Sequence, residues 1–385
     1  MRRVADADHA HATEGIDSPS RLIRSFCREC DGFCRASKKD RQMDAFSQIL
    51  SGVVLKGALF FNAEFSAPWG FNAPPAQELA PWLAPDAPHL LVYHFLVEGS
   101  GFVRLGNEAP IMLDAGEVVV VPHGDPHEMC SAQGMGHTLS EAMIAKLQTR
   151  DLTAMHAGGG GEVARFVCGF MVCDPLLCRP ILQSLPQAFK VNLRTDRSGQ
   201  WLEKTLLHLV EEAASENAGS EAVLAKMSEA LFVDTLRRYL ASLPEQEVGW
   251  LAAARDPIIG KSLMLLHSRA QHPWTIAELA KEVGLSRSSL VERFTKYLSE
   301  PPMAYLIRWR LQLAARALAS TSRGVAEIAE DVGYESEAAF NRAFKREFGS
   351  PPARYRKEHR GANDQENSLP AWQKLERAYS SRTMG

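Results

Sequence analysis

The sequence repeats itself once near its C-terminus, and this duplication constrains the fold more than any other feature. The segment AELAKEVGLS at 277–286 returns as AEIAEDVGYE at 326–335. The copies stay in register afterwards, with Phe294 matching Phe344. The offset is 49 residues at the start and 50 from these phenylalanines onward, so the second copy has one extra residue after its turn. Register kept over this length indicates two copies of one structural unit.

Each copy is predicted to form a helix-turn-helix. Gly284 and Gly333 supply the sharp turns, because glycine adopts backbone angles that strain other residues. Ser286 and Ser336 lie where the second helices need N-caps. After each cap, apolar residues recur at every fourth position, so the second helix buries one face and turns the other outward. In helix-turn-helix proteins this outer face enters the major groove of DNA.

A rigid helix is predicted between the two units. The segment Met303–Ala319 keeps apolar residues at helical spacing and contains no Gly or Pro. A rigid connector fixes the distance between the second helices of the two copies, which we call the reading helices. Consecutive major grooves on one face of DNA lie about 34 Å apart. One chain can therefore contact two consecutive major grooves.

The distribution of charge also favours DNA binding by this region. Residues 255–360 hold 18 Lys and Arg against 12 Asp and Glu, whereas the whole chain has a net charge of -3.

Residues 257–357 resemble the DNA-binding domain of the AraC/XylS family of bacterial transcription regulators. The resemblance rests on the doubled helix-turn-helix, the connecting helix and a C-terminal signature, which consists of Ile328-Ala329, Val332-Gly333-Tyr334, Phe340, Phe344-Lys345, Phe348-Gly349, Pro351-Pro352 and Tyr355-Arg356. It implies a regulator, not an enzyme, that binds specific sequences in double-stranded DNA and contacts RNA polymerase.

The family pattern also implies which residues touch DNA. Its base-reading positions fall on Ser288, Val291 and Glu292 of the first reading helix, and on Glu337, Ala338, Asn341 and Arg342 of the second. Arg342 can donate two hydrogen bonds to guanine, and Asn341 can pair with adenine. Phosphate contacts are expected from Arg287, Lys296, Arg308, Lys345 and Arg346. The alternative for each of these charges is a solvated surface with no role in binding.

The N-terminal half predicts a β-sandwich or barrel, because short β-branched and apolar runs from Val53 to about Cys173 are separated by Gly, Pro and Asn. Residues 116–127 match the second cupin motif, G-x5-P-x-G-x2-H. This region resembles the cupin-like sensor domain of one branch of the same family. We therefore expect a multidomain α and β fold, in which a cupin-like β-barrel with a helical hairpin precedes an all-α double helix-turn-helix domain.

Three polar residues are expected to converge inside the barrel, where strand alternation and the cupin motif place His94, Glu98 and His127. They could bind zinc, iron or manganese as a two-histidine, one-carboxylate site, although Val92 stands where metal-binding cupins have a further histidine. His89 has an odd offset from His94, which directs it to the opposite strand face. Alternatively, the three residues line an apolar pocket for a small-molecule effector. A metal would also allow a competing function, a metal-dependent cupin enzyme with an accessory DNA-binding domain.

Seven cysteines are an odd number that does not indicate a disulfide framework. Cys168 and Cys173 are candidates for a redox sensor, the alternative being buried, inert thiols. Near the N-terminus, Cys27, Cys30 and Cys34 have the spacing of zinc or iron–sulfur ligands, but a fourth ligand is not evident.

A helical hairpin is predicted at Trp201–Leu243, because its apolar residues change to helical spacing. It either packs on the barrel or pairs with a second subunit, and we expect a homodimer. No run of 18 apolar residues and no signal peptide is present, so a cytoplasmic protein without a membrane partner is expected. The identity of the effector, the operator sequence and the choice between activation and repression stay open.

The expected organisation has five segments. These are a disordered leader (1–42), the cupin-like sensor barrel (43–195), the hairpin for dimerisation (196–250), the double helix-turn-helix domain (251–360) and a disordered tail (361–385). Met43, the first residue of the second segment, is a candidate translation start.

Overall fold

The computed structural model describes residues 46–47, 50, 56–85, 87–132, 141–149, 152–213, 219–244 and 246–367. The predicted leader with Cys27, Cys30 and Cys34 lies outside these residues, as do Met43 and the end of the chain after 367. In the part of the chain that is described, no helix is both long enough and apolar enough to cross a membrane.

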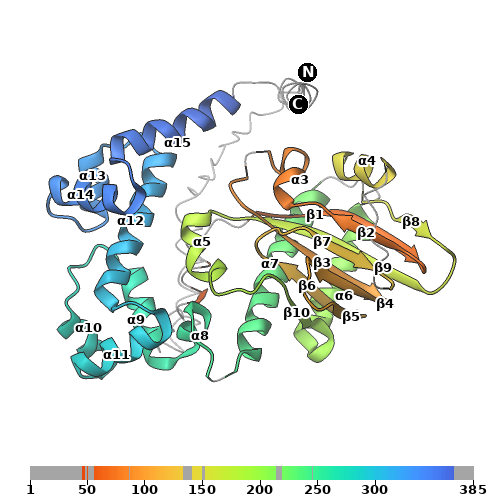
Figure 1. The fold of residues 1–385 in the computed structure, drawn as a ribbon, viewed down its shortest axis with the longest axis horizontal. Helices are drawn as coiled ribbons and strands as arrows, with labels where there is room; N and C mark the ends of the chain where they lie inside the picture. Colours follow the sequence, from red (N-terminus) through yellow and green to blue (C-terminus); the bar gives the residue numbers. More distant parts are fainter. Residues whose placement is uncertain are drawn as a thin grey trace, which may run out of the picture. The chain divides into compact units, whose positions relative to one another are not determined.

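The strands are β1 (Lys56–Ser66), β2 (Gly70–Ala73), β3 (Leu90–Glu98), β4 (Ser100–Leu105), β5 (Ile111–Asp114), β6 (Glu117–Val121), β7 (His127–Cys130), β8 (Met155–Gly158), β9 (Val163–Val172) and β10 (Phe189–Asn192). They form a six-stranded sheet in the order β10-β6-β3-β9-β1-β8 and a four-stranded sheet in the order β2-β7-β4-β5 (Figure 1). This β-rich half confirms the barrel prediction.

The helices are α3 (Ala76–Leu83), α4 (Glu141–Thr149), α5 (Pro175–Leu182), the 3-10 turn η1 (Leu193–Thr195), α6 (Arg197–Ala213), α7 (Ser220–Ser242), α8 (Trp250–Arg255), α9 (Pro257–Ser268), α10 (Ile276–Val283), α11 (Arg287–Leu298), α12 (Pro302–Ser320), α13 (Val325–Asp331), α14 (Glu337–Phe348) and α15 (Pro352–Asn367). Helix α15 continues to Asn367, beyond the predicted domain end at 360.

Strand β3 is buried on both faces, which explains its unbroken apolar sequence. Val92 and Leu96 belong to the core between the two sheets, whereas Tyr93 and Phe95 belong to a second core on the outer face of the six-stranded sheet. This follows from the two-residue period of a strand. A displacement of β3 would therefore change the packing on both faces of the sheet.

Helices α6 and α7 cover the outer face of the six-stranded sheet. Leu206, Leu224, Leu231 and Leu236 are buried there together with Tyr93. The hairpin thus packs on the barrel, the first of its two predicted arrangements. Because its main apolar stripe is covered by this chain's own sheet, the stripe is not available to a second subunit.

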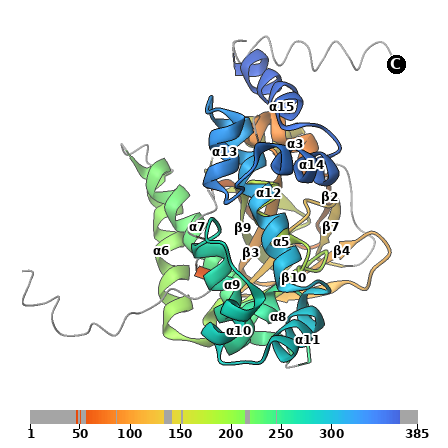
Figure 2. The ribbon, with the colours of Figure 1, turned by 90° about the vertical axis from the view of Figure 1, so that its left-hand side faces the viewer.

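The C-terminal region contains two helix pairs, α10–α11 and α13–α14, at opposite ends of α12 (Figure 2). Gly284 and Gly333 adopt left-handed backbone angles, with φ of 73° and 85°. The side chain of Ser286 accepts a hydrogen bond from the backbone of Ser289, and that of Ser336 accepts one from Ala339. The predicted turns, caps and connecting helix are confirmed.

Six of the fourteen residues of the C-terminal signature stabilise the second unit from inside. They are buried in one core with residues of α12, and this group comprises Ile328, Ala329, Val332, Phe340, Phe344 and Tyr355. These six residues therefore stabilise the fold of the unit. The residues that determine DNA sequence preference are expected on the exposed side of α14.

Candidate functional site

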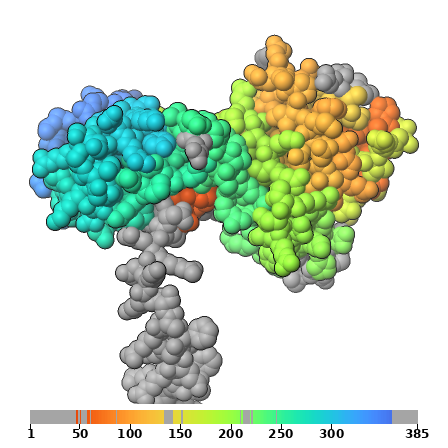
Figure 3. Space-filling model, turned by 90° about the horizontal axis from the view of Figure 1, so that it is seen from below, coloured from red at the N-terminus to blue at the C-terminus, as the bar shows by residue number. Residues whose placement is uncertain are grey.

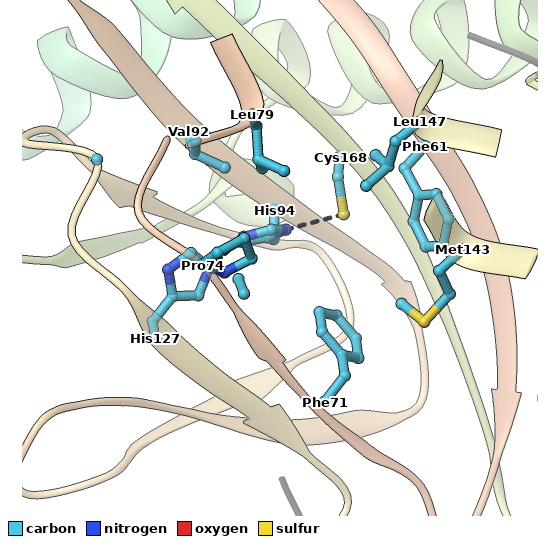
Figure 4. Close-up of a pocket in the computed structure, with 12 residues that line it drawn as sticks. Phe61, Phe71, Pro74, Leu79, Val92, His94, His127, Met143, Leu147 and Cys168 are labelled. Carbon is cyan, nitrogen blue, oxygen red and sulfur yellow. Dashed lines mark hydrogen bonds between the residues drawn. The ribbon is translucent and has the colours of Figure 1, made fainter. Parts of the chain in front are cut away.

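A narrow pocket lies between the two sheets and is closed on one side by α4 (Figure 4). Its volume is about 30 Å³, enough for one or two water-sized molecules. A larger ligand must displace lining side chains, and the unbranched Met143 is well suited to move. The lining consists of Phe61, Phe71, Ala73, Pro74, Leu79, Val92, His94, Gly124, His127, Met143, Leu147 and Cys168.

Two imidazoles and one thiol are the chemically distinctive groups of this pocket. His94 of β3 lies beside Cys168 of β9, its partner in the strand register. The His94 Nδ1 atom is 2.8 Å from Cys168 Sγ, and its Nε2 atom is 2.8 Å from Nε2 of His127. The His127 Nδ1 atom is 2.9 Å from the backbone oxygen of Asp125. Three strands and one loop therefore position one continuous hydrogen-bonded chain.

Burial keeps this chain of groups uncharged. It lowers the pKa of His94 well below the usual value, and the neighbouring His127 lowers it further. Burial also lowers the pKa of His127, although the hydrogen bond to Asp125 opposes this effect. The same burial raises the pKa of the Cys168 thiol. At neutral pH the pocket holds two neutral imidazoles and a protonated thiol.

Glu98 does not join the histidines, which corrects the predicted convergence of three residues. It is the last residue of β3, it is exposed, and it does not line the pocket. The pairing of β3 with β9 also shifts register between Leu96 and Glu98. Simple strand alternation, counted from His94, therefore fails at the end of this strand.

The predicted metal site is not assembled either. Within the described ranges, no group of three or more His, Cys, Asp or Glu residues is arranged to hold a metal ion. Cys168 and His127 contact opposite nitrogens of the His94 ring, so the three residues do not converge on one point. His89 instead has its Nε2 atom 2.9 Å from the backbone oxygen of Pro122.

The predicted redox pair is also separated. Cys168 belongs to the core between the sheets, whereas Cys173 belongs to the core on the outer face. Cys173 lies next to Cys178 of α5, which shares a side-chain hydrogen bond with it. No pattern in the sequence indicates that Cys168 faces His94, because that contact depends on the register of two strands and joins residues 74 positions apart.

The first reading helix, α11, exposes part of its predicted base-reading face. Ser288 and Glu292 are exposed, and Val291 is partly buried. On the other side, Leu290 and Phe294 are fully buried. The positions thus have the accessibility that contact with DNA requires, and their role as base-reading residues stays a prediction.

The second reading helix, α14, is more strongly polar on its outer face. Glu337, Ala338 and Arg342 are exposed, and Asn341 is partly buried. Arg342 forms no hydrogen bond or ion pair with any described residue, so its guanidinium group is available for a base edge. Asn341 and Arg342 line the same shallow hollow as Lys345.

The predicted phosphate contacts divide into two groups. Within the described part of the chain, no ion pair holds the exposed residues Arg287, Lys296, Lys345 and Arg346. Arg308, in contrast, forms an ion pair with Glu300 and lies over the ring of Tyr305 at 5.7 Å. Arg308 is thus already engaged within its own domain.

Comparison with known proteins matches both halves of the chain. Residues 44–241 match the Cupin family, and residues 279–358 match the Helix-turn-helix domain family. An AraC-like transcription regulator of Streptomyces antibioticus is 31% identical over 275 residues, which cover 71% of this chain and 88% of that protein.

Two further similarities extend the comparison. The HTH-type transcriptional regulator AlkR of Acinetobacter baylyi is 26% identical over 320 residues, which cover 82% of this chain and 100% of that protein. The crystal structure of the AdpA DNA-binding domain in complex with a target DNA is similar at 28% identity. That similarity covers 29% of this chain and 98% of the AdpA chain, with a TM-score of 0.28.

Proposed function

Because the chain belongs to the AraC family of transcription regulators and carries a cupin domain, we propose that a small molecule bound in the pocket between its sheets controls its binding to DNA. The relatives that it matches are transcriptional regulators, so the alternative of a cupin enzyme is not retained. The observation that carries the proposal is an apolar pocket whose polar groups, His94, His127 and Cys168, are buried and mutually hydrogen-bonded.

The chemistry of the pocket favours an uncharged, largely apolar effector. Both imidazoles are neutral, so neither offers a positive charge to an anion. An ionised ligand would lose its hydration without gaining an ion pair, which is costly in an apolar cavity. An uncharged ligand instead gains from burying its apolar surface against residues such as Phe71 and Leu79.

Strand β3 provides a route from the pocket to the hairpin. Val92 and His94 line the pocket, and Tyr93 between them forms a hydrogen bond with Ser228 of α7 on the other face. Tyr93 fits because its neighbour is Gly169, where a Cβ atom would lie 2.1 Å from the tyrosine hydroxyl. A ligand that binds two positions of β3 with different affinity would shift α7 accordingly.

Helix α5 provides a second route, from the barrel to the DNA-binding region. Asp174 caps this helix and also lies 3.6 Å from the guanidinium group of Arg316 in α12. At the other end of α5, Arg179 is 4.0 Å from Glu347 of α14. These contacts reach the connecting helix and the second reading helix, so they can bias where the reading helices lie.

For the DNA complex we propose that α11 and α14 enter consecutive major grooves. Arg342 and Asn341 would read guanine and adenine, and Glu292 would accept a hydrogen bond from cytosine. The exposed cations Arg287, Lys296, Lys345 and Arg346, which form no ion pair with any described residue, would contact phosphates. Arg308 is omitted from this set because Glu300 already neutralises it.

We also propose a cytoplasmic homodimer that contacts RNA polymerase at promoters. The buried stripe of the hairpin is excluded as the interface, but the opposite face of α6 and α7 exposes Trp201 and Val223, at 64% and 47%. Figure 3 shows the surface of α6, in yellow-green, beside the green surface of α7. A second copy on this face would bury the exposed tryptophan, a residue type enriched at interfaces.

Two ligands of similar size test the proposed class of effector. Butanone is uncharged, and butyrate is its ionised counterpart at pH 7. Butanone should raise the melting temperature of the full chain, and butyrate should not. Ala73→Leu, which adds volume to the pocket lining, should abolish the butanone effect, whereas Ala326→Leu, at an exposed position in α13, should preserve it. An equal effect of butyrate, or a butanone effect that survives Ala73→Leu, would overturn the proposal.

A further inference from the structure

The hydrogen-bonded chain in the pocket has a fixed direction. The backbone oxygen of Asp125 can only accept, so Nδ1 of His127 must donate to it. Since His127 is neutral, its Nε2 atom carries no proton and accepts from Nε2 of His94. That leaves Nδ1 of neutral His94 as an acceptor, and the Cys168 thiol donates to it. The backbone carbonyl of Asp125 thus determines the position of every proton in this hydrogen-bonded chain of side chains.

The result is a nucleophile hydrogen-bonded to a base that a third group orients. Cys168 is the nucleophile, His94 is the base, and His127 holds the ring of His94 in place. This is the general arrangement by which proteins activate a thiol. Cys130, Cys173 and Cys178 are the other free cysteines among the described residues, and none of them lines the pocket.

We propose that Cys168 covalently captures small, uncharged electrophiles that carry a carbon–carbon double bond conjugated to a carbonyl group. The apolar lining selects for uncharged reagents, and the small cavity selects for short ones. The thiol is a modification site in its own right. Any effect of the adduct on DNA binding rests on the proposed function of the pocket as a sensor.

The reaction needs no co-reactant. As the sulfur atom forms a bond to the β-carbon of the electrophile, the thiol proton passes to Nδ1 of His94. The electron pair of the double bond moves toward the α-carbon and the carbonyl. His94 then returns its proton to the α-carbon, so that S–H has been added across the double bond. Burial raises the pKa of the thiol and lowers that of His94, so the proton is transferred while the bond between sulfur and carbon forms and not before it.

Methyl vinyl ketone is a suitable probe, because butanone has the same skeleton without the reactive double bond. The full chain would be treated with limiting methyl vinyl ketone, and the adduct at each cysteine would be followed by peptide mass mapping. Cys168 should react at least about 10-fold faster than Cys130, Cys173 and Cys178, given the usual contribution of a positioned base. Excess butanone should slow the reaction at Cys168 and leave the other cysteines unaffected.

The variant His94→Gln removes the base, and the reaction at Cys168 should slow by about 100-fold. The butanone competition needs no substitution, so it tests whether Cys168 reacts within the pocket even if this variant fails to fold. A Cys168 rate equal to that of the other cysteines, or one that excess butanone does not change, would overturn the proposal. Butanone stabilisation of the chain without preferential reaction at Cys168 would retain the effector pocket and reject only covalent capture.

Discussion

The hydroxyl group of Tyr93 in β3 lies 2.5 Å from the hydroxyl group of Ser228 in α7, and both side chains are buried. The bond joins the sheet that forms the pocket to the hairpin on its outer face. Burial raises the pKa of Tyr93, so its hydroxyl stays protonated and can take part in this bond across the neutral range. The contact is therefore both a stabilising interaction and a link between two functional elements.

Tyr93→Phe should destabilise the chain by about 1–3 kcal/mol. Among the described residues, the buried Ser228 hydroxyl then keeps only the sulfur atom of Met171 as a partner, at 4.0 Å. Urea unfolding measures this loss. The double variant Tyr93→Phe/Ser228→Ala removes both partners and should recover part of the stability. If the double variant loses the full sum of the two single losses, the two hydroxyl groups are not coupled.

Replacing Arg342 with Ala should cost about 1–3 kcal/mol on the cognate DNA site and relax the preference at one base position. The reason is that Arg342 is exposed and without an intramolecular partner among the described residues. Lys345→Ala is the matched control, because a phosphate contact should weaken all sequences alike and reduce the salt dependence. Titrations of cognate and random DNA measure both effects. If Arg342→Ala weakens the affinity for cognate and random DNA equally, Arg342 contacts a phosphate and not a base.

Trp201→Asp should convert the dimer to a monomer while leaving the fold intact, because the indole is mostly exposed within one chain. Leu231→Asp should instead unfold the hairpin, since Leu231 is fully buried against the sheet. Sedimentation and circular dichroism separate the two results. A wild-type chain that is monomeric at micromolar concentration, or a Trp201→Asp variant that remains dimeric, would contradict the proposed interface.

Acid should destabilise the DNA-binding region through His267, whose pKa burial lowers to about 3. A buried imidazole with a pKa below its unfolded value of about 6.5 stabilises the fold above pH 6.5. That stability is lost as the pH falls from 6.5 toward 3, by about 1.4 kcal/mol per pH unit.

The substitution His267→Phe should therefore flatten the dependence of unfolding free energy on pH between 6 and 4. Stacking of the ring on Trp309, at 4.2 Å, would be retained. Substitution of the exposed His208 by Phe serves as the matched control. An unchanged slope in His267→Phe would show that other groups cause the acid sensitivity.

The DNA-binding region could be predicted from the sequence nearly in full, because its helices are local structures. Caps such as Ser286 and turn glycines such as Gly284 act within a few residues of their position, and the duplication provides each observation twice. The barrel could be predicted only as a class, since strand pairing joins segments far apart in the chain. Its motif located His127 correctly within the pocket, together with His94.

The errors at the pocket have the same physical origin. Counting alternate residues from His94 places Glu98 in the site, but a register shift and the end of β3 intervene. The contact of Cys168 with His94 cannot be predicted from the sequence alone, because it depends on which strands are neighbours. The helical hairpin is predicted correctly, but periodicity alone does not reveal whether its apolar stripe is covered by the same chain or by another.

The most direct test of the proposed control by an effector is to measure how pocket occupancy changes the affinity for DNA. The dissociation constant for a duplex selected by the chain from random sequence would be measured with and without saturating butanone, in the wild type and in Ala73→Leu. If pocket occupancy controls DNA binding, the dissociation constant should change by about 5- to 150-fold in the wild type, the usual range of coupling between two sites, and should not change in Ala73→Leu. A wild-type protein that binds butanone but keeps the same DNA affinity would contradict control of DNA binding by the pocket.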